Sequence, residues 1–279
     1  MSYVIVRPAF WFACEYPTER SYGQSELRYP SWNWLFCEGP FIRNSVAESI
    51  LFTATVRKLE KFYGRPKPPK TTDPLELILL ENIAYLADDD RRGAAFAALK
   101  KKIGTRPDQI LKASQNQLEE ITRMGGIVPE LRAQRLRQIA ELVHYIFNDG
   151  LDAELKRPLP QAKKALRRFP TIGDPGAEKI LMLTRSYPVL ALESNGLRVM
   201  LRLGYAEEKK SYSASYRGVQ QALAGQLPAD YDALISTHQL LRQHGQELCK
   251  RTRPLCEAGC PLTAECRYFQ GLARQKLGK

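Results

Sequence analysis

The sequence predicts an all-α protein that begins with an aromatic segment of extended or β structure. Three observations support this prediction. Apolar residues recur at helical spacing from residue 44 to residue 243. Prolines and glycines separate the periodic stretches and so mark where helices start and stop. All three tryptophans fall within residues 1–45, where core packing is favoured over a platform for unstacked bases.

The first half of the chain predicts a series of buried helices. A helix is expected over Asn44–Tyr63, with Asn44 or Ser45 as its N-cap. The proline-rich stretch Arg65–Lys70 is stiff and extended, and it marks a domain junction. A helix from Pro74 to about residue 87 is apolar nearly all round and is therefore expected to be buried. Further helices are expected near residues 91–103, 114–123 and 129–147.

The stretch from residue 159 to residue 200 organises the rest of the chain. Leu159–Phe169 is amphipathic with a basic outer face, and a proline ends it. Gly173 and Gly176 then allow a sharp reversal before a second helix, Ala177–Arg185. The free amides at the start of such a helix attract phosphate. From this stretch alone, an ordinary helical hairpin is the simpler interpretation.

Four of the six cysteines follow three more predicted helices, at residues 197–203, 212–223 and 231–243. Their spacing is Cys-x6-Cys-x3-Cys-x5-Cys, and four thiolates at such spacing can hold a [4Fe–4S] cluster or a zinc ion. The even spacing favours the cluster, with zinc as the alternative. A clustered ligand set is typical of a reducing compartment, so a cytoplasmic location is expected. The clustered cysteines are Cys249, Cys256, Cys260 and Cys266, whereas Cys14 and Cys37 are expected to be buried thiols.

The charge of the chain indicates a polyanionic partner. A formal net charge of +12 suits nucleic acid first and a membrane surface second. No apolar run has the length of a membrane span, and the N-terminus lacks a basic leader with a cleavage site. The sequence therefore predicts neither a membrane-spanning helix nor a signal peptide.

Two of these motifs together resemble the helix-hairpin-helix DNA glycosylases, especially endonuclease III and the adenine glycosylase of mismatch repair. Their hairpin reads Leu-Pro-Gly-Val-Gly, and residues 169–173 read Phe-Pro-Thr-Ile-Gly. Their catalytic aspartate precedes an Arg-Val pair, and residues 192–199 place Glu193 ahead of the same pair. Their cysteine loop also follows a His-Gly pair, here His244 and Gly245. The glycosylase loop has two residues between its second and third cysteines, whereas this chain has three.

The resemblance covers about residues 73–266 and implies two helical lobes. Residues 70–187 would form a helical barrel that ends in the helix-hairpin-helix at residues 159–185. Residues 1–69 and 188–279 would form the lobe that carries the cluster. Glu193 would lie at the mouth between the lobes, where sites usually form.

The resemblance also implies which residues act in catalysis. Glu193 would stabilise positive charge on the deoxyribose and orient a water, although its carboxylate reaches roughly 1.5 Å further than that of aspartate. The lysine that makes some members AP lyases corresponds to Pro175, which cannot form a Schiff base. Lyase chemistry is therefore expected to be lost. Lys179, about one helical turn further on, is a weak alternative amine.

Expected DNA contacts come from three places. Asn82 corresponds, by a weak alignment, to a glutamine that fills the gap left by an extruded base. The loop after Cys249 carries Lys250, Arg251 and Arg253, whose charge would contact phosphate rather than read sequence. A solvated basic loop is the alternative. The expected hairpin contacts are Thr171, Gly173, Gly176, Ala177 and Lys179.

The implied function is removal of a damaged or mismatched base from double-stranded DNA by a monomeric, monofunctional glycosylase that flips the base out of the duplex. Two alternatives remain open. One is a lesion or DNA-structure binding protein with little or no catalysis. The other is an AP lyase that uses Lys179 or another amine.

Overall fold

Helices form the part of the chain that the structure describes. The computed structural model describes residues 43–277, and side chains between residues 52 and 275. Within residues 43–277 there is no β-strand, and an isolated bridge joins Tyr85 to Gly126. The predicted all-α body is therefore confirmed. The aromatic segment expected to be extended or β, together with Cys14 and Cys37, lies outside the described residues.

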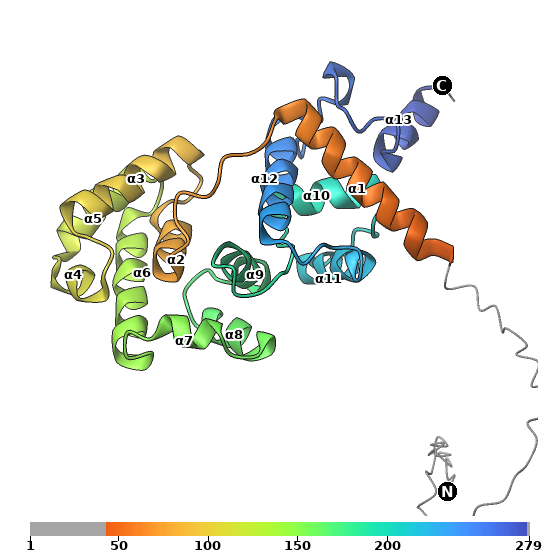
Figure 1. Ribbon diagram of the computed structural model, residues 1–279. Coiled ribbons are helices and arrows are strands. Elements are labelled where there is room, and N and C mark those ends of the chain that lie inside the picture. Colours follow the sequence, from red (N-terminus) through yellow and green to blue (C-terminus); the bar gives the residue numbers. More distant parts are fainter. Residues whose placement is uncertain (1–42, 278–279) are drawn as a thin grey trace, which may run out of the picture. The chain divides into compact units, whose positions relative to one another are not determined.

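Two groups of helices pack around separate central helices (Figure 1). In the first group α6 packs against α2, α4 and α5, and α3 packs against α5. The bounds in this group are α2 (Pro74–Ile83), α3 (Asp89–Lys102), α4 (Pro107–Lys112), α5 (Gln115–Met124), α6 (Pro129–Glu141), α7 (Leu151–Leu155), α8 (Leu159–Leu166) and α9 (Asp174–Leu183).

The second group is centred on α10 and α12. Helix α10 packs against α11, α12 and α13, and α1 packs along α12 (Figure 1). Helix α9 contacts α2 and α8 in the first group and α12 in the second, so it joins the two. The bounds are α1 (Arg43–Tyr63), α10 (Ser194–Leu203), α11 (Tyr212–Leu223), α12 (Tyr231–Glu247) and α13 (Arg267–Leu277). The predicted lobe boundaries at residues 69/70 and 187/188 remain a prediction.

Local capping explains where several helices begin. Asp73 accepts a hydrogen bond from the amide of Glu76, and Pro74 occupies the first turn of α2, where no amide donor is needed. Asp88 likewise caps α3 by accepting from the amide of Arg91 at 2.8 Å. The acidic run at residues 88–90 thus forms the capping turn of α3, where negative charge is favoured.

Three helix ends differ from the prediction. The helix expected to run to residue 87 ends at Ile83 because the chain turns to form the bridge at Tyr85. The helix expected over residues 129–147 ends at Glu141 and continues as a π-helical turn, Leu142–Ile146. Helix α9 begins at Asp174, three residues before the expected start, because Pro175 suits the first turn of a helix. No described helix has both the length and the apolar character needed to cross a membrane.

Candidate nucleic-acid interface and catalytic site

The hairpin between α8 and α9 turns on a threonine rather than a glycine. Thr171 has φ of +66°, in the left-handed region that costs a residue with a Cβ roughly 1–2 kcal/mol. Gly173 has φ of −92° and is the N-cap of α9, so its backbone freedom is not what makes the turn. The expected role of the two glycines in the reversal is therefore corrected.

Asn82 compensates for this strained turn. Its amide group donates to the carbonyl of Pro170 at 3.1 Å and to the carbonyl of Ile78 at 3.0 Å. Its oxygen accepts from the Thr171 hydroxyl at 3.1 Å. The Asn82 side chain is 2% exposed. The structure therefore assigns Asn82 to holding the hairpin, in place of the expected contact with a gap in the duplex.

The first turn of α9 presents backbone amides without a capping side chain. Gly173 offers no cap, and Pro175 has no amide donor. The amide of Ala177, by contrast, donates to the carbonyl of Gly173 at 2.9 Å, and Ala177 is fully buried, so its expected DNA contact is not available. Gly173 is exposed and Gly176 is half-buried, so the first turn of α9 remains open to an anion.

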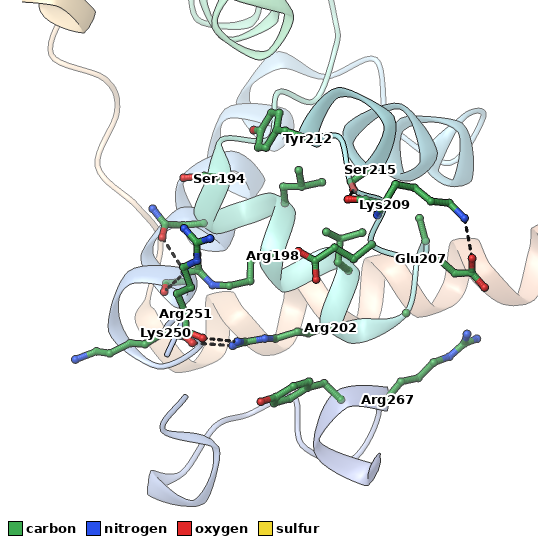
Figure 2. A pocket seen from close by; sticks show the side chains of 18 of the residues that line it. Ser194, Arg198, Arg202, Glu207, Lys209, Tyr212, Ser215, Lys250, Arg251 and Arg267 are labelled. Atoms are coloured by element: carbon green, nitrogen blue, oxygen red, sulfur yellow. Dashed lines mark hydrogen bonds and ion pairs between the residues drawn. The ribbon is translucent and has the colours of Figure 1, made fainter. Parts of the chain in front are cut away.

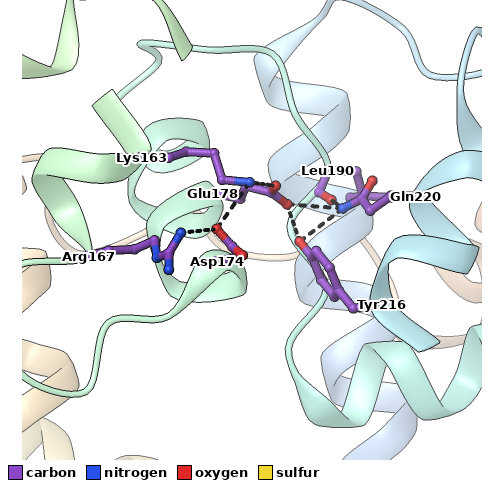
Figure 3. Close-up of polar contacts among 7 residues, drawn as sticks. All are labelled: Lys163, Arg167, Asp174, Glu178, Leu190, Tyr216 and Gln220. Carbon is purple, nitrogen blue, oxygen red and sulfur yellow. Dashed lines mark hydrogen bonds and ion pairs between the residues drawn. The ribbon is translucent and has the colours of Figure 1, made fainter. Parts of the chain in front are cut away.

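One carboxylate stands at this helix start and is neutralised locally. Asp174 lies 3.4 Å from the ammonium of Lys163 and 3.7 Å from the guanidinium of Arg167, both at the end of α8 or just after it (Figure 3). The basic outer face predicted for this helix thus supplies the counter-charges. The first turn of α9 can consequently meet a phosphate without facing an unpaired carboxylate.

Glu193 is the N-cap of α10. Its Oε1 accepts from the amides of Asn195 at 2.9 Å and Gly196 at 3.0 Å. Its Oε2 accepts from the side-chain amide of Asn195 at 3.0 Å. A carboxylate has about four lone-pair positions, so these three bonds leave one position on Oε2 for another donor.

Three consecutive carbonyls before Glu193 are held by side chains of α11 and α12. Gln220 donates to the carbonyl of Leu190 at 2.8 Å, and Nδ1 of His238 lies 2.7 Å from the carbonyl of Ala191. The Tyr212 hydroxyl donates to the carbonyl of Leu192 at 3.4 Å. Burial, followed by the charge of Lys179, lowers the pKa of His238 to about 4, so its ring is neutral at pH 7.

A buried carboxylate links the hairpin to the same segment. Glu178 on α9 accepts from Lys163 at 2.6 Å, from the Tyr216 hydroxyl, and from Gln220 at 3.2 Å (Figure 3). Gln220 is also the residue that holds the carbonyl of Leu190. Burial, followed by the charge of Glu178, raises the pKa of Tyr216 well above its usual value. The hairpin and the backbone leading to Glu193 therefore share one polar network.

Lys179 is not a surface lysine. Its ammonium lies 2.5 Å from the carboxylate of Glu81 on α2, and its side chain is 18% exposed. Burial alone would raise the pKa of Glu81, but the Lys179 ammonium holds it below the usual value. The interpretation of Lys179 as a phosphate contact is therefore corrected, because its charge is already matched inside the protein.

Arg198 connects the start of α10 to the cysteine loop. Its guanidinium donates to the side chain of Asn195 at 2.8 Å, to the carbonyl of Gly245 at 2.7 Å and to the carbonyl of Cys249 at 2.8 Å. A glycine at position 245 lets α12 pack closely against Asn195, because a Cβ there would lie 2.7 Å from the carbonyl oxygen of Asn195. Glu193, Asn195 and Arg198 thus form a hydrogen-bonded chain that reaches the first clustered cysteine.

The four clustered cysteines line one cavity. The cavity also contains His244, whose Nε2 lies 3.6 Å from the sulfur of Cys260, and Arg202, which donates to the sulfur of Cys249 at 3.3 Å. Cys249 and Cys266 are buried, and Cys256 and Cys260 are half-buried. Within residues 43–277, no three His, Cys, Asp or Glu side chains are arranged to hold a single metal ion.

The basic loop between the first two cysteines is exposed, as the sequence predicts. Lys250, Arg251 and Arg253 all reach solvent, and their side chains make no ion pair with another described residue. Arg202 holds the loop from below by donating to the carbonyls of Lys250 at 2.8 Å and Arg251 at 3.0 Å. The backbone of the loop is therefore fixed while its charges remain free.

The sequence did not single out a pair of exposed apolar loops. Leu86 is 75% exposed with φ of +51°, and Ile127 is 52% exposed. The buried guanidinium of Arg132 holds both loops by donating to the carbonyls of Ile83, Gly126 and Ile127 at 2.5, 2.6 and 2.8 Å. Gly126 allows the loops to touch, since a Cβ there would lie 2.3 Å from the carbonyl oxygen of Tyr85.

Comparison with known proteins places this architecture. No family model matches the chain. Endonuclease III of Sulfolobus acidocaldarius is 24% identical over 201 residues, which cover 72% of this chain and 84% of the relative. Endonuclease III of Thermotoga maritima is 23% identical over 205 residues, which cover 74% and 88%.

Solved structures agree in fold. A non-covalent endonuclease III–DNA complex aligns with a TM-score of 0.64 at 19% identity, covering 81% of this chain and 98% of the other. A thermostable thymine-DNA glycosylase aligns with a TM-score of 0.61 at 17% identity, with the same coverage. The chain is similar in sequence to endonuclease III and shares the fold of these DNA glycosylases. The resemblance predicted from the hairpin and cysteine motifs is confirmed.

Three positions of this chain differ from the motifs of the proteins that it resembles. The hairpin has Thr171 at its left-handed position, where the superfamily motif has a glycine. The position expected to carry a Schiff-base lysine is Pro175, within the first turn of α9. The carboxylate that precedes the Arg-Val pair is Glu193 instead of aspartate, and it folds back onto the helix start.

Proposed function

We propose that this chain is a DNA glycosylase of base-excision repair. It would remove a damaged or mismatched base from double-stranded DNA, as a monomer and without AP lyase chemistry. The observation that supports the proposal best is the geometry of Glu193. Its carboxylate is fixed by three N–H donors at the start of α10, and one acceptor position on Oε2 remains free.

The chemistry needs a fixed anion beside the sugar. When the bond between the base and C1′ breaks, its electron pair leaves with the base and positive charge develops on the deoxyribose. The Glu193 carboxylate would stabilise that charge, and Oε2 would accept the proton of a water that attacks C1′. The three hydrogen bonds to Glu193 support this role because a preorganised anion does not have to reorient during the reaction.

The capping geometry of Glu193 also offsets the extra length of its side chain relative to aspartate. A glutamate with an extended side chain would place its oxygens roughly 1.5 Å beyond those of aspartate. Glu193 instead curls back to bond the amides two and three residues ahead, which shortens its reach. Tyr212 and Arg242 lie close to this carboxylate: its charge, after burial, raises the pKa of Tyr212 to about 12.

The loss of lyase chemistry is supported at both positions that could supply an amine. Pro175 has no primary amine. Lys179 has one, but the amine is held in an ion pair with Glu81 at 2.5 Å and is therefore not free to attack the sugar. A nucleophilic lysine needs a desolvated environment without such a partner.

We favour a [4Fe–4S] cluster over zinc for the cysteine cavity. A zinc–sulfur bond of about 2.3 Å would bring four sulfurs within about 3.8 Å of one another. The described cysteines line a common cavity but form no group suited to a single ion. Cys249, Cys256, Cys260 and Cys266 would hold the cluster, which supplies a rigid anchor for the loop when bound. Arg202 and Arg198 would then tie that anchor to α10.

DNA would be held from three directions. Phosphates would meet the first turn of α9 and the free charges of Lys250, Arg251 and Arg253. Leu86 and Ile127 would enter the base stack, because apolar side chains on rigid supports are suited to unstacking a base step. This assignment replaces Asn82 in the space that an extruded base leaves. The DNA strand would then lie between the two predicted lobes, residues 70–187 and residues 188–279.

A panel of duplexes with single damaged or mismatched bases tests the proposal. Each duplex is incubated with the protein and analysed with and without alkali. The proposal predicts at least one substrate that breaks only after alkali, which indicates base removal without strand cleavage. Borohydride trapping on abasic DNA should give no covalent adduct. A trapped adduct lost on Lys179→Ala would favour the lyase alternative.

A second candidate function keeps binding without chemistry. The observation that favours it is the replacement of aspartate by Glu193, since a misplacement of about 1 Å can cost roughly a hundredfold in rate. This candidate predicts tight binding to duplexes that contain an abasic site or mismatch, with every base of the panel left in place. Base release distinguishes the two candidate functions, because only the first predicts it.

A further inference from the structure

A long basic groove runs along α10 from its first turn to its last. The groove has a volume of about 1370 Å³ and begins at Ser194 and Asn195, the two residues that follow Glu193 in the chain. Figure 2 shows Ser194 and the other labelled residues that line it. One wall is the loop of residues 206–210, and the other is the loop that carries Lys250 and Arg251. Its far end is formed by Arg267 and Tyr268 at the start of α13. Ten residues of helix make the floor roughly 15 Å long.

Positive charge predominates in this groove. Seven basic and two acidic residues line it, and one of the two acids, Glu207, is paired with Lys209 at 2.8 Å. Arg198 and Arg202 are occupied with backbone carbonyls. The side chains of four others make no hydrogen bond or ion pair with any residue of the described chain. These four are Lys210, Lys250, Arg251 and Arg267.

Two exposed tyrosines stand at opposite ends of the groove. Tyr212 is 45% exposed next to Ser194, and its position is fixed by its bond to the carbonyl of Leu192 and by stacking on Tyr216. Tyr268 is 37% exposed at the far end, with the guanidinium of Arg202 4.5 Å from its ring centre. Figure 2 shows Tyr212 at the Ser194 end, away from Arg267.

Free cations together with exposed rings match one class of ligand. Proteins that bind single strands combine a positive groove for the backbone with aromatic rings on which bases stack. In a duplex each base face is covered by the neighbouring base. The phosphates of a duplex would therefore contact the cations, but no base would stack on either tyrosine. A floor of roughly 15 Å accommodates about four stacked nucleotides at 3.4 Å each.

We propose that the groove between the 206–210 loop and the Lys250–Arg251 loop binds single-stranded DNA that leads away from Glu193. The groove thereby extends the proposed function to lesions in bubbles, gaps or displaced strands. The proposal rests on nucleic-acid binding by this site and not on glycosidic chemistry.

Fluorescence anisotropy tests this proposal. It measures the binding of a labelled single-stranded 20-mer and of the corresponding blunt duplex. Tyr212→Ala removes one stacking surface, and base–aromatic stacking is commonly strong enough that its loss weakens binding roughly tenfold. We expect that loss for the single strand and a change of less than about twofold for the duplex. Tyr145→Ala is the matched control, because Tyr145 is 67% exposed outside the groove.

A second variant avoids any risk to folding from the tyrosine. The double variant Lys210→Ala with Arg267→Ala changes only exposed side chains. Each phosphate contact to a single strand contributes about 0.7 to the slope of log affinity against log salt. We expect the slope to fall in magnitude by about 1.4, whereas the control pair Lys101→Ala with Lys102→Ala leaves it unchanged.

The outcomes separate this proposal from the proposed function. The groove proposal is overturned if the wild-type protein does not bind the single strand. It is also overturned if the groove variants bind the single strand as wild type does, or lose single strand and duplex equally. If groove variants selectively lose the single strand while no base is released from any lesion, the groove proposal stands and the glycosylase proposal fails.

Discussion

Side chains that hold backbone carbonyls determine where Glu193 lies. Gln220, His238 and Tyr212 each bond one of the three carbonyls that precede it. The result is an extended backbone that cannot slide along α11 or α12 without breaking several bonds. Such fixed geometry matters for catalysis because a preorganised group loses little free energy when the transition state forms.

His238 should make stability depend on pH. Its pKa is lowered from 6.5 to about 4 in the folded protein, chiefly by burial. The folded state therefore binds the proton less readily than the unfolded state does. The contribution of this residue is fully present above about pH 6.5 and is lost as pH falls toward 4. Its size is on the order of 3 kcal/mol.

His238→Gln isolates this effect. Glutamine can still donate to the carbonyl of Ala191 but does not titrate. Urea unfolding at several values of pH should show a shallower fall of the free energy of unfolding between pH 6.5 and 4 than in the wild type. A fall of unchanged steepness would contradict the assignment, and would direct attention to Glu81 and Asp89, whose pKa values are also lowered.

Single residues also show where sequence reasoning succeeds. The hairpin and the gathering of the four cysteines could be predicted because each belongs to a local motif whose spacing carries the information, whereas the catalytic role of Glu193 stays a prediction. The roles of Asn82 and Lys179 were not predicted correctly. Their partners, Thr171 and Glu81, lie 89 and 98 residues away in the chain, and a single sequence does not show which distant groups will meet.

At the scale of elements, Arg132 holds two loops against the end of α2. Its guanidinium is fully buried and bonds three carbonyls, and burial lowers its pKa. Arg132→Leu would leave those carbonyls without donors in the interior, which should cost roughly 3 kcal/mol or more. Chemical denaturation measures this cost. A loss below about 1 kcal/mol would mean that water or another donor replaces the guanidinium.

The apolar loops that Arg132 holds have a separate, functional prediction. Leu86→Ala and Ile127→Ala should leave the unfolding midpoint nearly unchanged, since both side chains are exposed. Both should slow release of a paired base more than release of a mismatched one, because a mismatched base costs less to unstack. Leu131→Ala, also at an exposed apolar residue, is the matched control. Equal rates for all three variants would remove these loops from base extrusion.

These loops also explain why helix ends were harder to predict than helices. The periodicity of α2 continues past Ile83 in the sequence, so nothing local marks its end. The actual end is set by the bridge between Tyr85 and Gly126 and by the reach of Arg132 from α6. Start positions such as Asp73 and Asp88 were easier because the capping side chain is adjacent to the helix that it caps.

At the scale of the whole molecule, polar networks connect the parts that we propose to contact different features of DNA. Glu178 joins the hairpin to the segment before Glu193, and Arg198 joins the start of α10 to the cysteine loop. The first turn of α9, the Glu193 carboxylate and the basic loop are thereby held in one arrangement. The net charge of +12 gives that arrangement its general affinity for nucleic acid.

The central claim is that Glu193, fixed at the start of α10, breaks a glycosidic bond. Single-turnover base release by wild type and Glu193→Gln tests it most directly, on whichever duplex of the lesion panel wild type processes. Glutamine keeps the length of the side chain and an oxygen for the cap but has no negative charge. The account predicts that base release falls by at least about a hundredfold while duplex affinity changes little. Base release by Glu193→Gln at the wild-type rate would contradict it.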